Sequence, residues 1–184
     1  MIIPDTVFEK QLINQSFDSD KKVNGKMLMA DAKKVKKLYL GSQNFFTSGF
    51  TISNLSGIEY FSELEDLTIN DVLEDSLDLS HNKKLVAFSY FGYSGVGGRD
   101  FNRQYKTLEK VHFGKNDNLM TINIGLVWLE ELDISDLPKL TELYISSEPL
   151  TTVYVSSKQR KENLLDRISI EYWPERVKYK ICEK

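Results

Sequence analysis

Residues 129–155 read LEELDISDLPKLTELYISSEPLTTVYV, and this stretch decides the fold. The pattern L-x-x-L-x-I occurs twice in it, and a third unit of the same spacing follows. The apolar positions are Leu129, Leu132, Ile134, Leu140, Leu143, Ile145, Leu150, Val153 and Val155. Apolar and polar residues alternate at the end of each unit, as in a strand with one buried face. The stretch therefore predicts three short strands.

The spacing of these units indicates how the strands are connected. They recur every ten or eleven residues, too closely for a helix to lie between them, so two consecutive units make one turn of a coil. The distance from Leu132 to Val153 is 21 residues, and Ile122 to Leu143 is again 21. A fixed period of this length, with leucine at fixed positions, is typical of a stacked repeat protein. We expect an α/β repeat solenoid with parallel sheets.

Similar units occupy most of the chain and predict two sheets, because alternate units share a side of the coil. The predicted sheet A has strands centred on Leu67, Phe88, Ile122, Leu143 and Ile168. The predicted sheet B has strands centred on Leu77, Val111, Leu132 and Val153. Two insertions interrupt the repeats, at about residues 41–57 and 91–107.

Caps are expected at both ends, because a terminal repeat otherwise leaves an apolar cross-section open to water. Pro4 and Asp5 predict a helix start, and Phe8 and Leu12 give that helix one apolar face. A second short helix is predicted over residues 28–34. We assign residues 1–37 to a short helical N-terminal cap, 38–155 to the repeats and 156–184 to a C-terminal cap, all within one continuous domain.

The chain resembles leucine-rich repeat proteins, specifically the internalin-like, short-repeat kind found on bacterial surfaces. The repeats carry this resemblance, together with IPDTVFEKQLI at 3–13 and ISNLSGIEYFSELEDLTI at 52–69, which are similar to the cap and the first repeats of that family. The resemblance implies a right-handed coil that serves in adhesion as a ligand-binding surface and not as an enzyme. It also implies a secreted or cell-surface protein. No signal peptide is visible at Met1, so a cytosolic protein is the alternative.

Charge and composition exclude several classes of partner. The chain has 184 residues, a net charge of −3 and a pI near 5.5, which argues against binding to nucleic acid. No apolar run approaches the length of a membrane span, so we expect no membrane insertion. The single cysteine, Cys182, excludes an internal disulfide and a cysteine-based metal site.

One loop of the N-terminal cap is similar in spacing to a calcium-binding loop. Asp20, Lys22, Asn24 and Gly25 match its first half, with Asp31 at the twelfth position. Lys22 places a cation where a carboxylate ligand belongs, and Asp31 is short for bidentate binding. A metal-free turn is the interpretation we favour over a calcium loop, and we expect neither a metal site nor a cofactor.

A search for catalytic groups finds one polar column. The repeat spacing places Asp78, His112, Asp133 and Tyr154 in one outward row of sheet B. Such a row could supply acid–base chemistry, but polar pairs on a solvated face are the interpretation we favour. We therefore expect no enzyme. The alternative is a polysaccharide-active enzyme that uses Asp78 and Asp133 as its carboxylates.

The candidate binding surface is the outward face of sheet A. Its residues are mostly uncharged and polar, and Tyr144 and Phe91 are the aromatic side chains expected to project from it, a residue class enriched at binding hot spots. Around them we expect Thr68, Ser89, Asn123 and Arg167 to take part. The second insertion would add Tyr93, Arg99, Phe101, Arg103 and Tyr105, unless it folds back over a sheet edge.

These features favour a non-catalytic interaction module for a protein or glycan partner. We expect that partner to contact Tyr144, Phe91 and the insertion, and to ignore Asp133 and His112. A structural spacer within a surface assembly is a further alternative.

Overall fold

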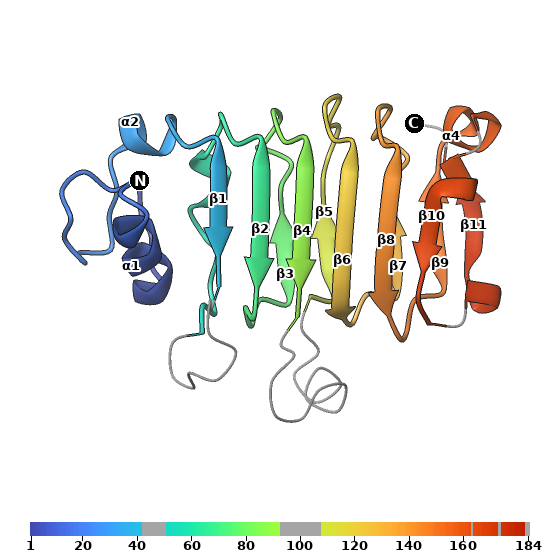
Figure 1. Ribbon diagram of the computed structural model, residues 1–184, viewed down its shortest axis with the longest axis horizontal. Helices are drawn as coiled ribbons and strands as arrows, with labels where there is room; N and C mark the ends of the chain where they lie inside the picture. Colours follow the sequence, from blue (N-terminus) through green and yellow to red (C-terminus); the bar gives the residue numbers. More distant parts are fainter. Residues whose placement is uncertain (42–50, 93–107, 163, 173, 183–184) are drawn as a thin grey trace.

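The computed structural model describes residues 1–41, 51–92, 108–162, 164–172 and 174–182 of the chain. Its largest sheet, sheet A, contains six parallel strands in chain order, which Figure 1 shows side by side. They are β1 (Lys37–Leu40), β2 (Asp66–Asn70), β4 (Ala87–Phe91), β6 (Thr121–Val127), β8 (Glu142–Ser147) and β10 (Ile168–Ile170). The neighbouring strands keep one register, in which Leu67 aligns with Phe88, Ile122 and Leu143. The predicted parallel sheet is confirmed.

The remaining strands form a second layer behind sheet A (Figure 1). They are β3 (Ser76–Asp78), β5 (Lys110–His112), β7 (Glu131–Asp133), β9 (Thr152–Val155) and β11 (Lys178–Ile181). From β2 to β9 the chain alternates between the two layers, which gives an α/β repeat fold with parallel sheets and few helices.

The prediction of one continuous sheet B was wrong. The second layer is divided into a β3–β5 pair and a three-stranded sheet in the order β11-β9-β7. In β6 the register against β8 shifts between Gly125 and Val127, and Leu126 has a φ of 55°. Leu108 and Gly114, which flank β5, also have positive φ values, of 48° and 57°. The division of the second layer therefore falls where the backbone is irregular on both sides, around β5 and just before the chain enters β7.

The helices are short and lie mainly at the two ends (Figure 1). They are α1 (Thr6–Asn14), α2 (Met29–Ala32), α4 (Ser157–Lys161) and the 3-10 turns η1 (Ile58–Tyr60), η2 (Leu164–Arg167) and η3 (Pro174–Arg176). Asp5 caps α1 as predicted, since its Oδ1 accepts from the amides of Val7 and Phe8. The division into caps and repeats at residues 37 and 155 stays a prediction.

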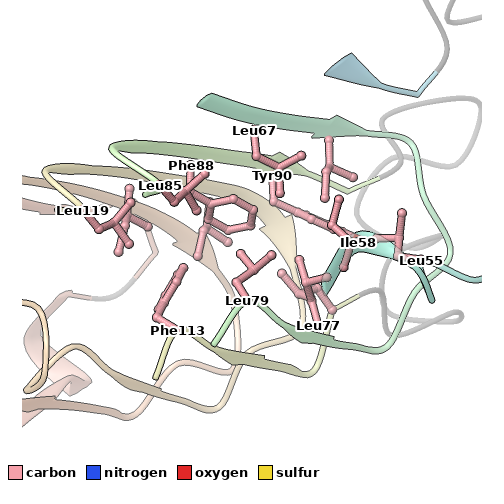
Figure 2. Packing of buried hydrophobic residues seen from close by; sticks show 14 of the residues in the cluster. Leu55, Ile58, Leu67, Leu77, Leu79, Leu85, Phe88, Tyr90, Phe113 and Leu119 are labelled. Carbon is pink, nitrogen blue, oxygen red and sulfur yellow. The ribbon is translucent and has the colours of Figure 1, made fainter. Parts of the chain in front are cut away.

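The core lies between the two layers. Alternate residues of β2 and β4 are buried, which is the pattern of strands that bury one face. Figure 2 shows Leu67 and Phe88 from sheet A on one side of this core, and Leu77, Leu79 and Phe113 from the second layer on the other. Phe88 and Phe113 meet edge to face, with ring centroids 5.5 Å apart.

The buried side-chain amides of Asn82, Asn116 and Gln159 connect successive turns of the chain, and we call these three residues the amide column. The Nδ2 of Asn82 donates to the carbonyls of Ile58 and Phe61, at 2.9 and 3.1 Å. The Nδ2 of Asn116 donates to the Asn82 carbonyl at 3.2 Å. Gln159 does the same at the C-terminal end, where its Nε2 donates to the carbonyls of Ile134 and Leu137 at 2.7 and 2.9 Å. Each of these carbonyls also accepts a backbone amide within its own turn, so the column adds a second hydrogen bond to it and ties one turn to the next.

Candidate functional site

The outward face of sheet A carries one row of predicted binding residues. The strand register aligns Thr68 with Ser89, Ser89 with Asn123, and Asn123 with Tyr144. Ser169 of β10 continues the row beside Tyr144. Neighbouring strands lie about 4.8 Å apart, so the row places one polar or aromatic side chain at each step across five strands.

Tyr144 is held in position by Glu171, which directly follows β10, the next strand of sheet A. The Tyr144 hydroxyl donates to Oε2 of Glu171 at 2.7 Å. This hydrogen bond is the main cause of the raised pKa of Tyr144. The ring is half-buried, so Tyr144 presents one fixed orientation. The predicted sheet A already placed the strands of these two residues together, but the spacing did not predict the hydrogen bond itself.

Phe91 differs from the expectation of a projecting side chain. It is half-buried, and its ring lies against Gly125 of the neighbouring strand. A Cβ at position 125 would lie only 2.7 Å from Cδ1 of Phe91, so glycine there makes room for the ring. Phe91 therefore packs partly into the sheet surface and projects less than the sequence pattern predicted.

Part of the predicted row is closed to solvent. Within the described residues, Oδ1 of Asn123 and Oγ of Ser146 are buried and have no hydrogen-bond partner. Ser146, which points outward beside Gly125, is only 2% exposed. Less of the outward face of sheet A is therefore exposed than the strand pattern predicted.

The other predicted binding residues are Arg167 and five residues of the second insertion. Arg167 is exposed and ends η2, just before β10. Tyr93, Arg99, Phe101, Arg103 and Tyr105 lie outside the described residues, so their predicted role remains a prediction.

The second layer carries a hollow that the sequence did not predict. It measures about 580 Å³, and Asp78, His112, Asp133 and Tyr154 all line it. The structure thus brings together the four residues of the predicted polar column, although they belong to two different sheets. Burial alone would raise the pKa of Asp78, but hydrogen bonds from Ser80 and the nearby charges of His112 and His81 lower it. Asp78 is therefore held ionised, which suits charge pairing better than proton donation.

The loop that resembled a calcium site is closed by a carboxylate from α1. Glu9 is fully buried, and its two oxygens accept from the backbone amides of Asn24, Gly25 and Lys26, each at 3.0 Å. Asp20 accepts from the Lys22 amide and from Nδ2 of Asn24. Across the described ranges, no group of three or more His, Cys, Asp or Glu residues could hold a metal ion. The described helices also include none that is long and apolar enough to cross a membrane.

Comparisons with known proteins return a distant structural likeness. No family model matches the chain, and no curated protein matches it. A crystal structure of an internalin from Listeria monocytogenes aligns over 100% of this chain with 14% identity and a TM-score of 0.42. The chain spans 59% of the length of that internalin chain. The repeat fold described above accordingly rests on the strand order and register of this chain itself.

Proposed function

We propose that the chain is a right-handed leucine-rich repeat solenoid of the internalin-like kind and acts as a non-catalytic interaction module. Its partner would be a protein, or alternatively a glycan, that contacts the outward face of sheet A. The observation that carries the proposal is the shared register of five strands, which aligns Thr68, Ser89, Asn123, Tyr144 and Ser169 in one row.

Tyr144 and Phe91 on this face are suited to binding because they are already ordered. Glu171 holds the hydroxyl of Tyr144, and Gly125 receives the ring of Phe91. Side chains fixed before binding lose less conformational entropy when a partner arrives. Tyrosine is also among the residues that most often dominate the energy of an interface.

The test begins with a binding screen of the chain against displayed extracellular proteins and a glycan array. A ligand found in this way should lose at least about 1 kcal/mol of binding free energy when Tyr144 is changed to alanine. Tyr154→Ala, a matched tyrosine truncation in the second layer, should leave the affinity unchanged. Loss of binding in Asp133→Ala and His112→Ala, with Tyr144→Ala unaffected, would place the functional face on the other layer.

The same proposal assigns the protein to the outside of the cell or to its surface. Interaction modules of this kind act on partners that they meet there, which is what the sequence resemblance implies. Fractionation of the source cells with an antibody to the chain tests this assignment. Recovery in the cytosolic fraction alone would contradict it.

A further inference from the structure

Sheet A ends differently at its two sides. In the first strand, β1, the core residues Leu38 and Leu40 are buried. Gln11 and Gln15 of α1 hydrogen-bond to the backbone at the outer edge of this strand. At the last strand, β10, no described strand pairs with the outer edge, and no described backbone group hydrogen-bonds to it (Figure 1). The edge of β1 is therefore closed, and the edge of β10 is open.

The core is also less covered at β10 than in the strand before it. Leu143 and Ile145 of β8 are 1% and 0% exposed. Ile168 and Ile170 of β10, which align with these two residues, are only half-buried. Ser169 between them is exposed. A further strand beside β10 would therefore cover two apolar side chains that sheet A leaves partly open to water.

The backbone of β10 directs hydrogen-bonding groups to its open edge. In a parallel pair, successive residues turn their N–H and C=O groups alternately to one side and to the other. The Glu171 amide donates to the Ile145 carbonyl of β8, so the backbone groups of Ser169 face β8 as well. The amides and carbonyls of Ile168 and Ile170 then point to the open edge. They supply two donors and two acceptors for a further strand.

The sequence around β10 favours a second copy of the same strand as the occupant of this edge. Ile168-Ser169-Ile170 is symmetric about Ser169, and the oppositely charged Arg167 and Glu171 flank it. In an antiparallel pair centred on Ser169, Ile168 lies opposite Ile170 of the second copy, and Arg167 opposite its Glu171. A parallel pair in register would set Arg167 against Arg167, and like charges directly opposite are destabilising. The carboxylate of Glu171 need not be free, because backbone groups join the strands and the charges favour only the direction.

β10 also lacks the features by which proteins protect an edge strand from pairing with another chain. Such strands commonly carry lysine or proline, or contain a bulge. β11, the edge strand of the three-stranded sheet, carries Lys178 and Lys180. Ile168–Ile170 contains no lysine or proline, and its register against β8 is regular. Pairing with another chain is therefore disfavoured at β11 and favoured at β10.

We propose that two copies of this chain associate through β10, in an antiparallel pair with Ser169 of each copy at the two-fold axis. The closed edge of β1 excludes the head-to-tail alternative, in which β10 of one copy would pair with β1 of the next. The dimer joins the two sheets A into one sheet and places Tyr144 of both copies on the same face. It does not depend on the function proposed for that face. Because β10 has 3 residues, the interface is small, and the dimer forms at high protein concentration.

Sedimentation equilibrium of the chain, without any ligand, tests the association. The average mass should rise with protein concentration from that of one chain toward that of two. Ser169→Lys should abolish this rise, because it sets two lysines opposite each other at the axis. The matched control is Ser56→Lys, at an exposed serine in the turn before η1, and it should associate as the unaltered chain does.

A disulfide cross-link tests the antiparallel register. Ser169 would face its counterpart as a non-hydrogen-bonded pair, in which the Cα atoms lie about 4.5 Å apart. A disulfide can span that distance. In a Cys182→Ser background, which removes the native thiol, Ser169→Cys should therefore give a covalent dimer on mild oxidation. Ser56→Cys in the same background should remain a single chain.

The cross-link also decides the proposal should Ser169→Lys fail to fold, because serine and cysteine are similar in size. A mass that stays at one chain at every concentration would overturn the proposal. So would a mass that grows beyond two chains, equal loss of association in Ser56→Lys, or equal cross-linking of Ser56→Cys.

Discussion

Gln11 and Gly41 exchange two hydrogen bonds across 30 residues of sequence. The Oε1 of Gln11 accepts from the Gly41 amide at 2.8 Å, and its Nε2 donates to the Gly41 carbonyl at 3.2 Å. One turn later on α1, Gln15 forms the same pair of contacts with the backbone of Tyr39. Two glutamine side chains thus occupy the edge of β1 as a neighbouring strand would, and they end sheet A at this side.

Replacing Gln11 with alanine should therefore destabilise the protein. The Gly41 amide and carbonyl would lose their partners at the sheet edge, at a cost of about 1–3 kcal/mol. The free energy of unfolding from urea denaturation measures this loss. Lys10→Ala, an exposed change on the same helix, should cost less than about 0.5 kcal/mol. An equal effect of the two changes would show that the edge contacts of Gln11 contribute nothing.

The core position of Leu143 gives a second prediction. Leu143 is 1% exposed and lies in β8 of sheet A, between Ile122 of β6 and Ile168 of β10. Leu143→Ala should lower the free energy of unfolding by about 2–5 kcal/mol. The control is Glu142→Ala, an exposed change in the same strand. A loss below about 0.5 kcal/mol for Leu143→Ala would mean that its side chain is not in the core.

Asp5 should make stability depend on pH. Burial raises its pKa, but hydrogen bonds from Ser53, Phe8 and Val7 outweigh that effect and leave the pKa lowered. A lowered folded-state pKa stabilises the protein above the unfolded-state value of about 4, and the contribution is lost as pH falls through the folded-state value. Asp5→Asn keeps an N-cap acceptor but removes the charge, so at pH 7 it should destabilise the protein by less than the about 0.5–2 kcal/mol that loss of a cap costs. Urea denaturation of both proteins should show this difference constant from pH 7 to 5 and shrinking below about pH 4. A difference that grows on acidification would contradict the assignment.

Calcium should leave the melting temperature unchanged. Lys22 occupies a ligand position of the candidate loop, and Glu9 already satisfies the amides of its turn. Thermal melts with millimolar calcium and with a chelator measure this. Micromolar calcium affinity by calorimetry, lost in Asp20→Ala, would show that the loop is a metal site.

The repeat spacing was sufficient to predict sheet A, because each buried position recurs after a whole turn. A shift of the strand register by one residue would turn the apolar side chains out of the core. It could not predict the division of the second layer. GLV at 125–127 has the apolar pattern of an ordinary strand, and only the backbone of Leu126 shows the bulge. A bulge depends on dihedral angles that many residues can adopt.

Contacts between distant segments were also beyond the sequence pattern. Glu9 belongs to a helix whose polar face would be expected in water, yet it is fully buried by the turn that it binds. The spacing did predict that the strands of Tyr144 and Glu171 belong to one sheet, but not that the tyrosine hydroxyl donates to this carboxylate. The predicted row on sheet A followed from periodicity. The hollow in the second layer depends on how the β3–β5 pair and the β11-β9-β7 sheet lie relative to each other, which the repeat spacing does not determine.

The amide column gives this chain a preferred direction of assembly. Asn82, Asn116 and Gln159 each donate to carbonyls that lie earlier in the sequence. During synthesis the earlier segment leaves the ribosome first, so each amide finds its acceptors already in place. After truncation from the C-terminus, the amides of the remaining turns still have their carbonyl acceptors. A chain cut back from its N-terminal side leaves the first remaining amide buried without an acceptor.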